Sequence, residues 1–521
     1  MTSKRLRSAA LLSAAALLAC LPFSGEALAQ KKVLNYGMAS KDMGRLDPHL
    51  TATTPDKALL QMIFNGLVRF KPGSLNLEQM EPDLAEKWTR SADGKEWVFA
   101  LRKGVQCHRG YGELTSDDVV YSLKRASDTK TSSFASDYKD IDKIEAPDKY
   151  TVKITLKSSI PSLLLFVANL HGGNIVCKKA VEEAGENFKV KPIGTGPFMF
   201  EEYKPQQSVT LVANKDYFRG APKLERIVYR YIESEASRDL AFSAGELDLV
   251  YGRQDQTWVE RTKKVKDAVV AVIEPAELSS IYLNTKHDIL KDIRVRKAIA
   301  HAIDRKTMVQ LKGASTAREA KSIVPVGYLG QADDVPLLPY DLEKSKALLK
   351  EAGHPNGITL KIIHTNLSGM LPTMQAWQAM LKKAGINLEI DVVEHATFHA
   401  QIRKDLSPIV HYAAARPPVA DIYLSQFFHS RSQVNTPTAV TNFTHCNQAD
   451  AEIDAARGEP DAAKAKALWR TAQIKLMENV CAVPSHEQLQ VFAYKSDLVL
   501  GYDLKGSLSL GPPILETTYF K

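Results

Sequence analysis

Sequence patterns that mark catalytic, zinc and nucleic-acid sites are missing from this chain. There is no Gly-x-Ser-x-Gly and no His-Glu-x-x-His motif, and Ser485-His486-Glu487 has no partner that would complete a catalytic set. There is no Cys-x-x-Cys pair, which removes support for a zinc or thioredoxin-like site. No run of Lys or Arg with interleaved aromatic residues occurs. We therefore predict a protein that is not an enzyme and binds neither a metal nor nucleic acid.

Long apolar segments are also scarce, and the one near the N-terminus predicts export. Basic residues lie within residues 4–7, and residues 9–21 are apolar but too short to span a bilayer as a stable helix. Ala27-Leu28-Ala29 supplies small residues for cleavage. Residues 1–29 are therefore predicted to be a signal peptide, with Gln30 as the mature N-terminus.

A lipoprotein site in the same segment is the alternative. Leu17-Leu18-Ala19-Cys20 would direct cleavage before Cys20 and leave a lipidated N-terminus. No later segment is long and apolar enough to cross a membrane, so we expect the mature chain to be exported and soluble.

Strong charge of one sign is absent as well. The net charge is +8, of which Lys4, Arg5, Arg7 and Glu26 contribute +2, so the mature chain carries +6. Spread over about 490 residues, this excess only slightly favours an anionic ligand or surface. A chain of that length is too long for one hydrophobic core and predicts two or more lobes.

Cysteines are few, and four remain after cleavage: Cys107, Cys177, Cys446 and Cys481. An even number in an exported chain makes disulfides plausible, with three possible connectivities. Cys446 with Cys481 is the favoured pair because both lie in one C-terminal segment, and Cys107 with Cys177 is the weaker one. Four buried free thiols are the alternative.

Strands and helices alternate along the chain, which predicts an α/β fold. Thr115 and Asp118 form a variant capping box at the start of a helix, and Gly353 is suited to end the helix that Asp341 caps. The predicted strands are 33–37, 97–101, 150–156, 358–363 and 387–393, and the predicted helices are 115–126, 341–352 and 373–384.

Five sequence blocks carry a resemblance to a known family. They are Met80 to Trp88, Trp97 to Val105, Ile193 to Phe198, Asp292 to Arg305 and Tyr340 to Gly353. Together, and in this order, they resemble the family 5 extracellular solute-binding proteins, which are the ligand-capturing subunits of ABC importers. The resemblance extends from about Val33 to about Pro484.

The resemblance implies a two-lobed α/β periplasmic-binding-protein fold of the large class. Residues 31–75, 190–282 and 486–521 are expected to build lobe one, 76–189 an extra domain attached to it, and 283–485 lobe two. A small-molecule ligand would bind in the cleft between the lobes, and closure would be a hinge motion. The implied partners are membrane permease subunits with separate ATPase subunits. The protein would be a periplasmic monomer without a cofactor.

Arg416 is the predicted ligand anchor. In the peptide-binding relatives an Asp at the end of a lobe-two strand pairs with the ligand's α-amino group, and the segment from Tyr412 to Leu424 places Arg416 at that position. A guanidinium repels an ammonium ion but forms a bidentate, charge-assisted pair with a carboxylate. This predicts a carboxylate-bearing or otherwise anionic ligand. The alternative is that Arg416 points out of the cleft or pairs with Asp421.

Neighbours of Arg416 are the next candidates. Asp421 either contacts a cationic group of the ligand or serves as the N-cap of the following helix, and the cap is favoured. Ala413, Ala414 and Ala415 replace the bulky aromatic residue common in peptide binders, which predicts a larger pocket next to Tyr412. Their backbone groups could bind a ligand as an added strand would, or the alanines could simply pack tightly.

Other pocket candidates are Ser40, Tyr251, Tyr282 and Asn284, because aromatic walls with few polar anchors are typical of ligand pockets. Each could equally belong to the core or the hinge. Residues 194–197 (Gly-Thr-Gly-Pro) lack the Lys-Ser/Thr of a phosphate loop and are expected to form a tight inter-domain turn.

The histidines give only weak signals. His395 and His399 are spaced for a metal on a helix but lack a third ligand, and His411 alone does not predict nickel binding.

The sequence as a whole predicts a periplasmic binding subunit of an ABC importer that captures a small organic solute, carboxylate-bearing or a modified peptide. An ordinary di- or oligopeptide-binding protein of the same class is the first alternative. A sensory binding protein that docks a chemoreceptor and a secreted hydrolase are alternatives from other classes.

Overall fold

The structure is a computed structural model that describes residues 31–51, 53–160, 162–367, 369–414, 416–435, 441–508 and 511–521. The predicted signal peptide, its cleavage site, Cys20 and Ala415 lie outside these ranges. Residues 32–521 form one compact unit. Within the described ranges, no helix combines the length and the apolar character needed to cross a membrane.

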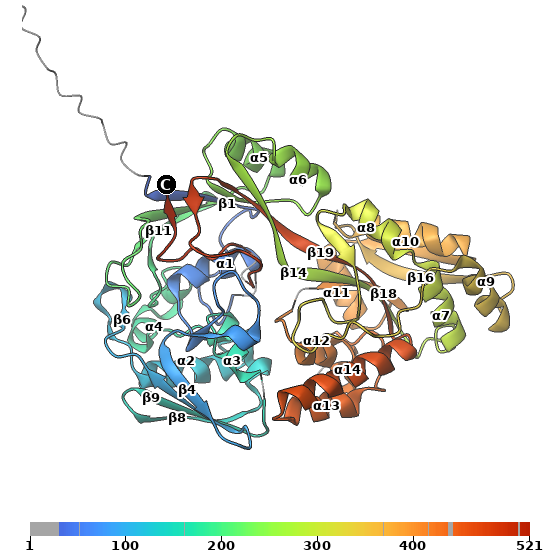
Figure 1. Ribbon diagram of the computed structural model, residues 1–521, viewed down its shortest axis with the longest axis horizontal. Coiled ribbons are helices and arrows are strands. Elements are labelled where there is room, and N and C mark those ends of the chain that lie inside the picture. Colours follow the sequence, from blue (N-terminus) through green and yellow to red (C-terminus); the bar gives the residue numbers. More distant parts are fainter. Residues whose placement is uncertain are drawn as a thin grey trace, which may run out of the picture. The chain divides into compact units, whose positions relative to one another are not determined.

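A nine-stranded mixed sheet is the largest element of the fold (Figure 1). Its strand order is β10-β11-β12-β1-β13-β19-β14-β18, and β15 pairs with β19 beside this path. The strands are β1 Val33–Met38, β10 Phe198–Lys204, β11 Ser208–Ala213, β12 Arg226–Tyr231, β13 Leu249–Tyr251, β14 Ala268–Leu283, β15 Ala317–Glu319, β18 Ile409–Ala414 and β19 Ala482–Lys495.

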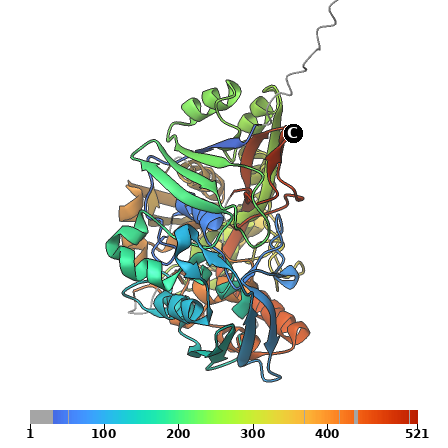
Figure 2. The same ribbon diagram turned by 90° about the vertical axis from the view of Figure 1, so that its left-hand side faces the viewer.

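Two long antiparallel strands, β14 and β19, connect the two ends of this sheet. The C-terminal part of β19 pairs with β13, and the C-terminal part of β14 pairs with β18. The red C-terminal strand and the green middle of the chain therefore lie side by side in both views (Figures 1 and 2). These two strands are thus the link between the two halves of the sheet.

Smaller sheets accompany the large one. An antiparallel four-stranded sheet has the order β4-β5-β9-β8, and β16 and β17 form a parallel pair. The bounds are β4 Ala85–Arg90, β5 Glu96–Leu101, β8 Ile141–Asp148, β9 Thr151–Leu156, β16 Ile358–Thr365 and β17 Ile386–Val393. Short hairpin-like pairs join β2 Val68–Arg69 with β3 Glu81–Pro82, β6 Gln106–Cys107 with β7 Gly112–Glu113, and β20 Leu498–Val499 with β21 Tyr519–Phe520.

Helices separate these strands, so the predicted α/β class is confirmed. The helices are α1 Thr54–Ile63, α2 Ser116–Ser127, α3 Leu163–Phe166, α4 Lys178–Ala184, α5 Glu235–Ser243, α6 Gln256–Thr262, α7 Ile293–Ala302, α8 Arg305–Lys312, α9 Leu342–Glu351, α10 Leu371–Lys383, α11 His395–Arg403, α12 Ala420–Phe427, α13 Asp450–Gly458 and α14 Ala462–Glu478.

Local capping signals set several of these boundaries. Thr115 is the N-cap of α2 and forms a capping box with Asp118, as predicted. The Asp341 side chain accepts a hydrogen bond from the Lys344 amide at the start of α9, and Gly353 has a φ of 90° just beyond its end. The predicted strands and helices are all present, with ends that differ by one or two residues.

Buried apolar residues gather in five clusters within the described ranges. Representative large side chains, one from each cluster, are Tyr423, Tyr229, Phe99, Trp377 and Trp258. The presence of several hydrophobic clusters agrees with the expectation that a chain of this length is too long for a single hydrophobic core. The residue boundaries of the two lobes and the extra domain stay a prediction.

Both disulfide pairs are present. Cys446 bonds to Cys481, which confirms the favoured pair, and Cys107 bonds to Cys177. The alternative of four free thiols is therefore wrong.

Candidate ligand-binding cleft

A cavity of about 820 Å³ opens above the long strands β14 and β19. One wall comes from the start of α5 and from residues 251–255, which begin at the last residue of β13. The opposite wall comes from the end of α8, the start of α10, α11 and β18. Glu277 and Ser279 of β14, with His486 and Gln488 of β19, line the floor. We call this space the cleft cavity.

Charged side chains of both signs line the cleft cavity. Three are acidic and three basic, namely Glu235, Asp255, Glu277, Arg238, Arg253 and Lys312. The guanidinium of Arg238 donates hydrogen bonds to the carbonyl oxygens of Ile232 and Glu233, at 2.7 and 2.8 Å. Arg253 lies 3.5 Å from Glu235 in an exposed ion pair. Asp255 is the N-cap of α6 and accepts from the Trp258 amide at 2.9 Å. Glu277 and Lys312 remain as two half-buried side chains of opposite charge.

Glu277 and Lys312 influence each other. Burial raises the pKa of the Glu277 carboxyl, while a hydrogen bond from Gln490 and the charges of Lys312 and Arg416 lower it. Burial lowers the pKa of the Lys312 amine, and the charge of Glu277 opposes that shift. Lys312 Nζ also donates to the carbonyl oxygen of Gly369 at 3.1 Å. An acid and an amine in one cavity can bind a solute that carries both a carboxylate and a hydrogen-bond donor.

Three of the predicted residues line the cleft cavity: Tyr251, Tyr412 and Ala413. Tyr251 donates to Gln490 Oε1 at 3.4 Å, and burial with the nearby Glu277 charge raises the pKa of Tyr251 to about 12. Tyr412 lies edge-on to the ring of His399, with centroids 5.8 Å apart. These aromatic rings form part of the side walls.

Four predicted residues lie away from this cavity. Ala414 and Tyr282 belong to a hydrophobic core, where the Tyr282 ring stacks on Phe427 with centroids 5.4 Å apart. Ser40 donates to the carbonyl oxygen of Asp42 at 2.9 Å, and Asn284 donates to Asp405 at 3.1 Å. None of the four is among the residues that line the cleft cavity in the described ranges.

Arg416 lies just beyond the end of β18, half-buried. Its Nε donates to Gln426 Oε1 at 2.7 Å, and its guanidinium lies 5.2 Å from the ring centroid of Phe427. The Tyr328 hydroxyl accepts from the Arg416 amide and donates to its carbonyl oxygen, at 3.1 and 2.7 Å. Arg416 does not line the cleft cavity among the described residues, but its charge acts on Glu277. Its role as a ligand anchor stays a prediction.

Asp421 is not the N-cap of α12, and that prediction is wrong. The helix begins at Ala420 with Val419 as N-cap. The Ala420 amide donates to Leu329, and a bridge between Val419 and Leu329 fixes the start of the helix ahead of Asp421. Both oxygens of Asp421 accept from Nε of Arg457 at 3.2 Å. Among the described residues, the ion-pair partner of Asp421 is Arg457 rather than Arg416.

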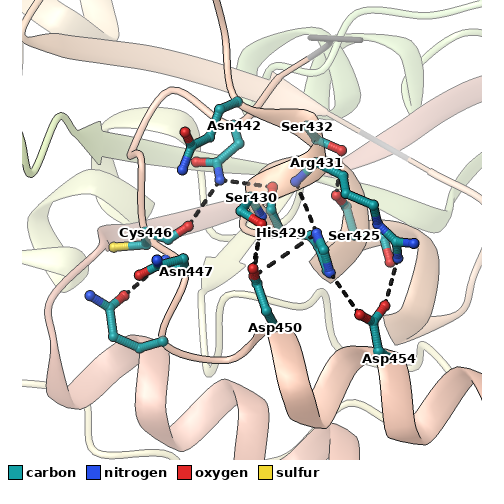
Figure 3. A network of polar contacts seen from close by, with 12 residues as sticks. Ser425, His429, Ser430, Arg431, Ser432, Asn442, Cys446, Asn447, Asp450 and Asp454 are labelled. Atoms are coloured by element: carbon teal, nitrogen blue, oxygen red, sulfur yellow. Dashed lines mark hydrogen bonds and ion pairs between the residues drawn. The ribbon is translucent and has the colours of Figure 1, made fainter. Parts of the chain in front are cut away.

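A cluster of His, Ser and Asp side chains lies between α12 and α13 (Figure 3). Nδ1 of His429 accepts from the Arg431 amide at 3.0 Å, and its Nε2 lies 3.3 Å from Asp454. Ser430 donates its hydroxyl to Asp450. A nucleophilic serine needs a base nitrogen that accepts its proton. Here the His429 imidazole contacts the Arg431 amide and Asp454, and the Ser430 hydroxyl donates to Asp450. The cluster fastens the loop after α12 to α13.

Histidines are more frequent in the cleft cavity than the sequence indicated. His395, His399, His411 and His486 all line it. His395 and His399 lie on α11 with their Nε2 atoms 3.2 Å apart. Across the described residues, no group of three or more His, Cys, Asp or Glu side chains is arranged to hold a metal ion.

Glu277, Ser279 and Lys312 were not predicted from the sequence. The one available signal was the pair of acids, Glu274 and Glu277, inside the otherwise uncharged strand β14. Lys312 gives no signal, because a lysine in the last turn of a helix is ordinary.

The second cavity of note measures about 710 Å³ and lies between the segment 74–78 and residues 326–334. It also includes Lys466 and Arg470 of α14. Lys466 pairs with Glu78 at 2.9 Å, and Arg470 pairs with Asp334, so charges at its rim are already matched. It is a weaker candidate for the ligand site.

Comparisons with known proteins agree with this architecture. The structure is similar to the binding protein MoaA of A. tumefaciens R10 in complex with mannopinic acid, with 48% identity, a TM-score of 0.83, and coverage of 94% of this chain and 100% of that one. It is also similar to the binding protein AgaA of A. tumefaciens R10 in complex with agropinic acid, at 25% identity, a TM-score of 0.77 and 94% and 99% coverage. These neighbours confirm the two-lobed periplasmic-binding-protein fold.

Curated relatives match over part of the chain. Heme-binding protein A of Haemophilus influenzae is 29% identical over 348 residues, which are 62% of this chain and 62% of the relative. Residues 79–435 match the family described as bacterial extracellular solute-binding proteins, family 5. That match spans more than half of the sequence, and the chain therefore belongs to the bacterial extracellular solute-binding proteins of family 5.

Proposed function

We propose that the protein is the solute-capturing subunit of an ABC importer and that it binds a small hydrophilic carboxylic acid in the cleft cavity. The observation that carries this proposal is that Glu277 and Lys312, two half-buried side chains of opposite charge, line the same cavity and act on each other electrostatically. The likeness to proteins solved with mannopinic and agropinic acid supports an acid as the ligand. We place the protein in the periplasm, where family 5 binding proteins act.

The proposed mechanism is capture, closure and delivery without chemical change of the solute. The wall from α5 and residues 251–255 and the wall from α10 and α11 stand on the same two strands, so a hinge in β14 and β19 would bring them together. Closure excludes water and strengthens the charged contacts to the solute. Permease subunits would then receive the solute, and separate ATPase subunits would supply the energy.

Arg416 is proposed as a second positive charge for the same acid. Its charge already acts on Glu277 and on Lys57 of α1. A carboxylate between these groups would relieve the repulsion between Arg416 and Lys57 and would favour the closed form. The predicted lobe boundaries, with α1 in lobe one and Arg416 in lobe two, belong to this proposal.

Peptides are the alternative ligands. The Pseudomonas aeruginosa relative named di/tripeptide-binding protein 2 is 31% identical over 314 residues. β18 occupies an edge position of the large sheet, so its backbone could accept an extended peptide as an added strand. In that case the ligand would depend on Ala413 and its neighbours rather than on Lys312. A chemoreceptor partner in place of a permease, and a hydrolytic activity, have no observation that favours them.

A ligand screen tests the proposal. The mature protein is unfolded, dialysed and refolded to remove co-purified solute, and its thermal unfolding is then measured with mannopinic acid, simple organic carboxylates, and free-amino di- and tripeptides. A ligand at 100 times its dissociation constant stabilises the fold by about 2.7 kcal/mol. We expect stabilisation by an acid. Stabilisation by peptides alone would contradict the proposal and favour the peptide-binding alternative.

A further inference from the structure

Three buried polar side chains form a chain of hydrogen bonds that ends at the floor of the cleft cavity. Nδ1 of His364 lies 2.9 Å from the carbonyl oxygen of Thr365, and its Nε2 lies 3.0 Å from Nδ1 of His411. Nε2 of His411 lies 2.9 Å from Oγ of Ser279. Ser279 is 3% exposed and His411 1% exposed, and both line the cavity. We call His364, His411 and Ser279 the relay.

The carbonyl at one end fixes the direction of every hydrogen bond in the relay. A carbonyl oxygen only accepts, so His364 carries its proton on Nδ1 and its Nε2 is an acceptor. His411 must then donate through Nδ1, which leaves its Nε2 to accept the hydroxyl proton of Ser279. The Ser279 proton is therefore committed to His411, and the lone pairs of its oxygen remain for a donor in the cavity.

The surroundings keep the relay uncharged. His411 faces His364 on β16, His486 on β19, Lys312 on α8 and the edge of the Trp377 ring on α10. Burial lowers the pKa of His411 well below its usual range, and the three basic neighbours lower it further. A neutral imidazole preserves the donor and acceptor assignment at physiological pH.

We propose that Ser279 determines ligand specificity in the cleft cavity by accepting a hydrogen bond from a hydroxyl or ammonium group of the bound solute. This inference rests on the proposed function and adds an orientation to it. The acid end of the solute lies toward Lys312, which donates, and a donor group of the solute lies toward Ser279, which accepts. A solute with a bare oxyanion at the Ser279 position is disfavoured because two acceptors would face each other.

The direction of the relay is tested on the unmodified protein by NMR. In 15N-labelled mature protein, long-range proton–nitrogen spectra distinguish a protonated from an unprotonated imidazole nitrogen, and single His364→Gln and His411→Gln variants assign the two signals. We expect both imidazoles to be neutral with the proton on Nδ1. A His411 proton on Nε2 would overturn the proposal, because Ser279 would then donate into the cavity.

Binding is tested with mannopinic acid as the probe and calorimetry as the readout. Ser279→Ala removes the acceptor, and we expect an affinity about three- to tenfold lower. Ser280→Ala is the matched control, because Ser280 is the next residue of β14, is buried, and does not line the cavity among the described residues. Unchanged affinity in Ser279→Ala would overturn the proposal.

The two experiments separate this inference from the proposed function. If the unmodified protein binds no organic acid, the proposed function fails, while the NMR spectra still decide the direction of the relay. If the acid binds and Ser279→Ala binds it equally well, the proposed function holds and the role of Ser279 is refuted. Circular dichroism of each variant verifies that a lower affinity does not come from unfolding.

Discussion

Glu277 is a carboxyl group between Ala276 and Leu278 in a mostly apolar strand that carries one other acid, Glu274. Burial makes the charged form of Glu277 costly. A buried ionisable side chain that destabilises the fold is expected to serve a function such as ligand binding. Lys312 is likewise a half-buried charged group, and burial lowers the pKa of its amine. The two residues are therefore the first targets for mutation.

Replacing Lys312 with Met removes the amine and keeps a long side chain. A hydrogen bond to a charged group contributes about 1.5–3 kcal/mol, so we expect an affinity for the acid that is about ten- to a hundredfold lower. Calorimetric titration at pH 7 measures the change. Lys350→Met, on the exposed face of α9, is the control and should bind as the parent protein does. Equal binding by both variants would place the carboxylate elsewhere.

Arg416→Ala tests the anchor predicted from the sequence. Loss of this charge should reduce the stabilisation by organic carboxylates and leave any stabilisation by peptides unchanged, because a guanidinium favours only the anion. Thermal unfolding with each ligand panel measures both effects. Arg470→Ala, in an exposed pair with Asp334, serves as the matched arginine control. A loss of peptide binding in Arg416→Ala would contradict the charge-based role.

Residues near one another in sequence were predictable, and residues brought together by the fold were not. Tyr251, Tyr412 and Ala413, all chosen from the sequence as pocket candidates, line the cleft cavity, and their contact with a ligand stays a prediction. Lys312 and Ser279 come from a helix end and a strand that carry no distinguishing local pattern. The N-cap role of Asp421 failed because contacts with Leu329, more than 80 residues earlier, start the helix sooner.

Among the elements, the turn at residues 194–197 connects more parts of the molecule than its length indicates. A Cβ at Gly194 would lie 2.1 Å from the carbonyl oxygen of Ile63 at the end of α1, so only glycine fits there. His108 Nε2 donates to Gly196 at 2.9 Å, and its Nδ1 accepts from the Gly194 amide at 3.3 Å. The imidazole can make both bonds only in its neutral form.

Acid should therefore weaken this turn. Burial lowers the pKa of His108 to about 4, below the value of about 6.5 for an unfolded chain. The unfolded state binds the proton more tightly, so stability from His108 is present above pH 6.5 and is lost as the pH falls to about 4, by about 3 kcal/mol in total. Unfolding by urea at several pH values measures this loss. His108→Gln should flatten the pH dependence in that window, and His354→Gln should not.

The disulfide between Cys446 and Cys481 fixes the loop that precedes α13 to the start of β19. It closes a loop with a sequence separation of 35 residues. Chain entropy alone gives a stabilisation of about 4 kcal/mol for such a loop. The double variant Cys446→Ala/Cys481→Ala should lower the free energy of unfolding by roughly 2–4 kcal/mol, as measured by urea denaturation. A change below about 0.5 kcal/mol would mean that the reduced chain is held equally well by packing.

At the scale of the whole molecule, the two walls of the cleft cavity share one sheet. The two walls are linked through β14 and β19. They can bend and twist relative to each other while the hydrogen bonds between these two strands persist. Ligand binding should then decrease the radius of gyration, and small-angle X-ray scattering with and without mannopinic acid measures it. Lys312→Met should show a smaller decrease at the same acid concentration. An identical radius with saturating acid would contradict hinge closure.

Strand β19 lies in the middle of the large sheet, between β13 and β14, yet it begins only at residue 482 of 521. A ribosome has therefore released almost the whole chain before the central strand is available. Until then β13 and β14 have no common partner, and the sheet has an open gap at its centre. We expect such late completion to postpone assembly of the large sheet until most of the chain has been synthesised. If the chain is exported as proposed, this strand order would postpone completion of the large sheet during synthesis.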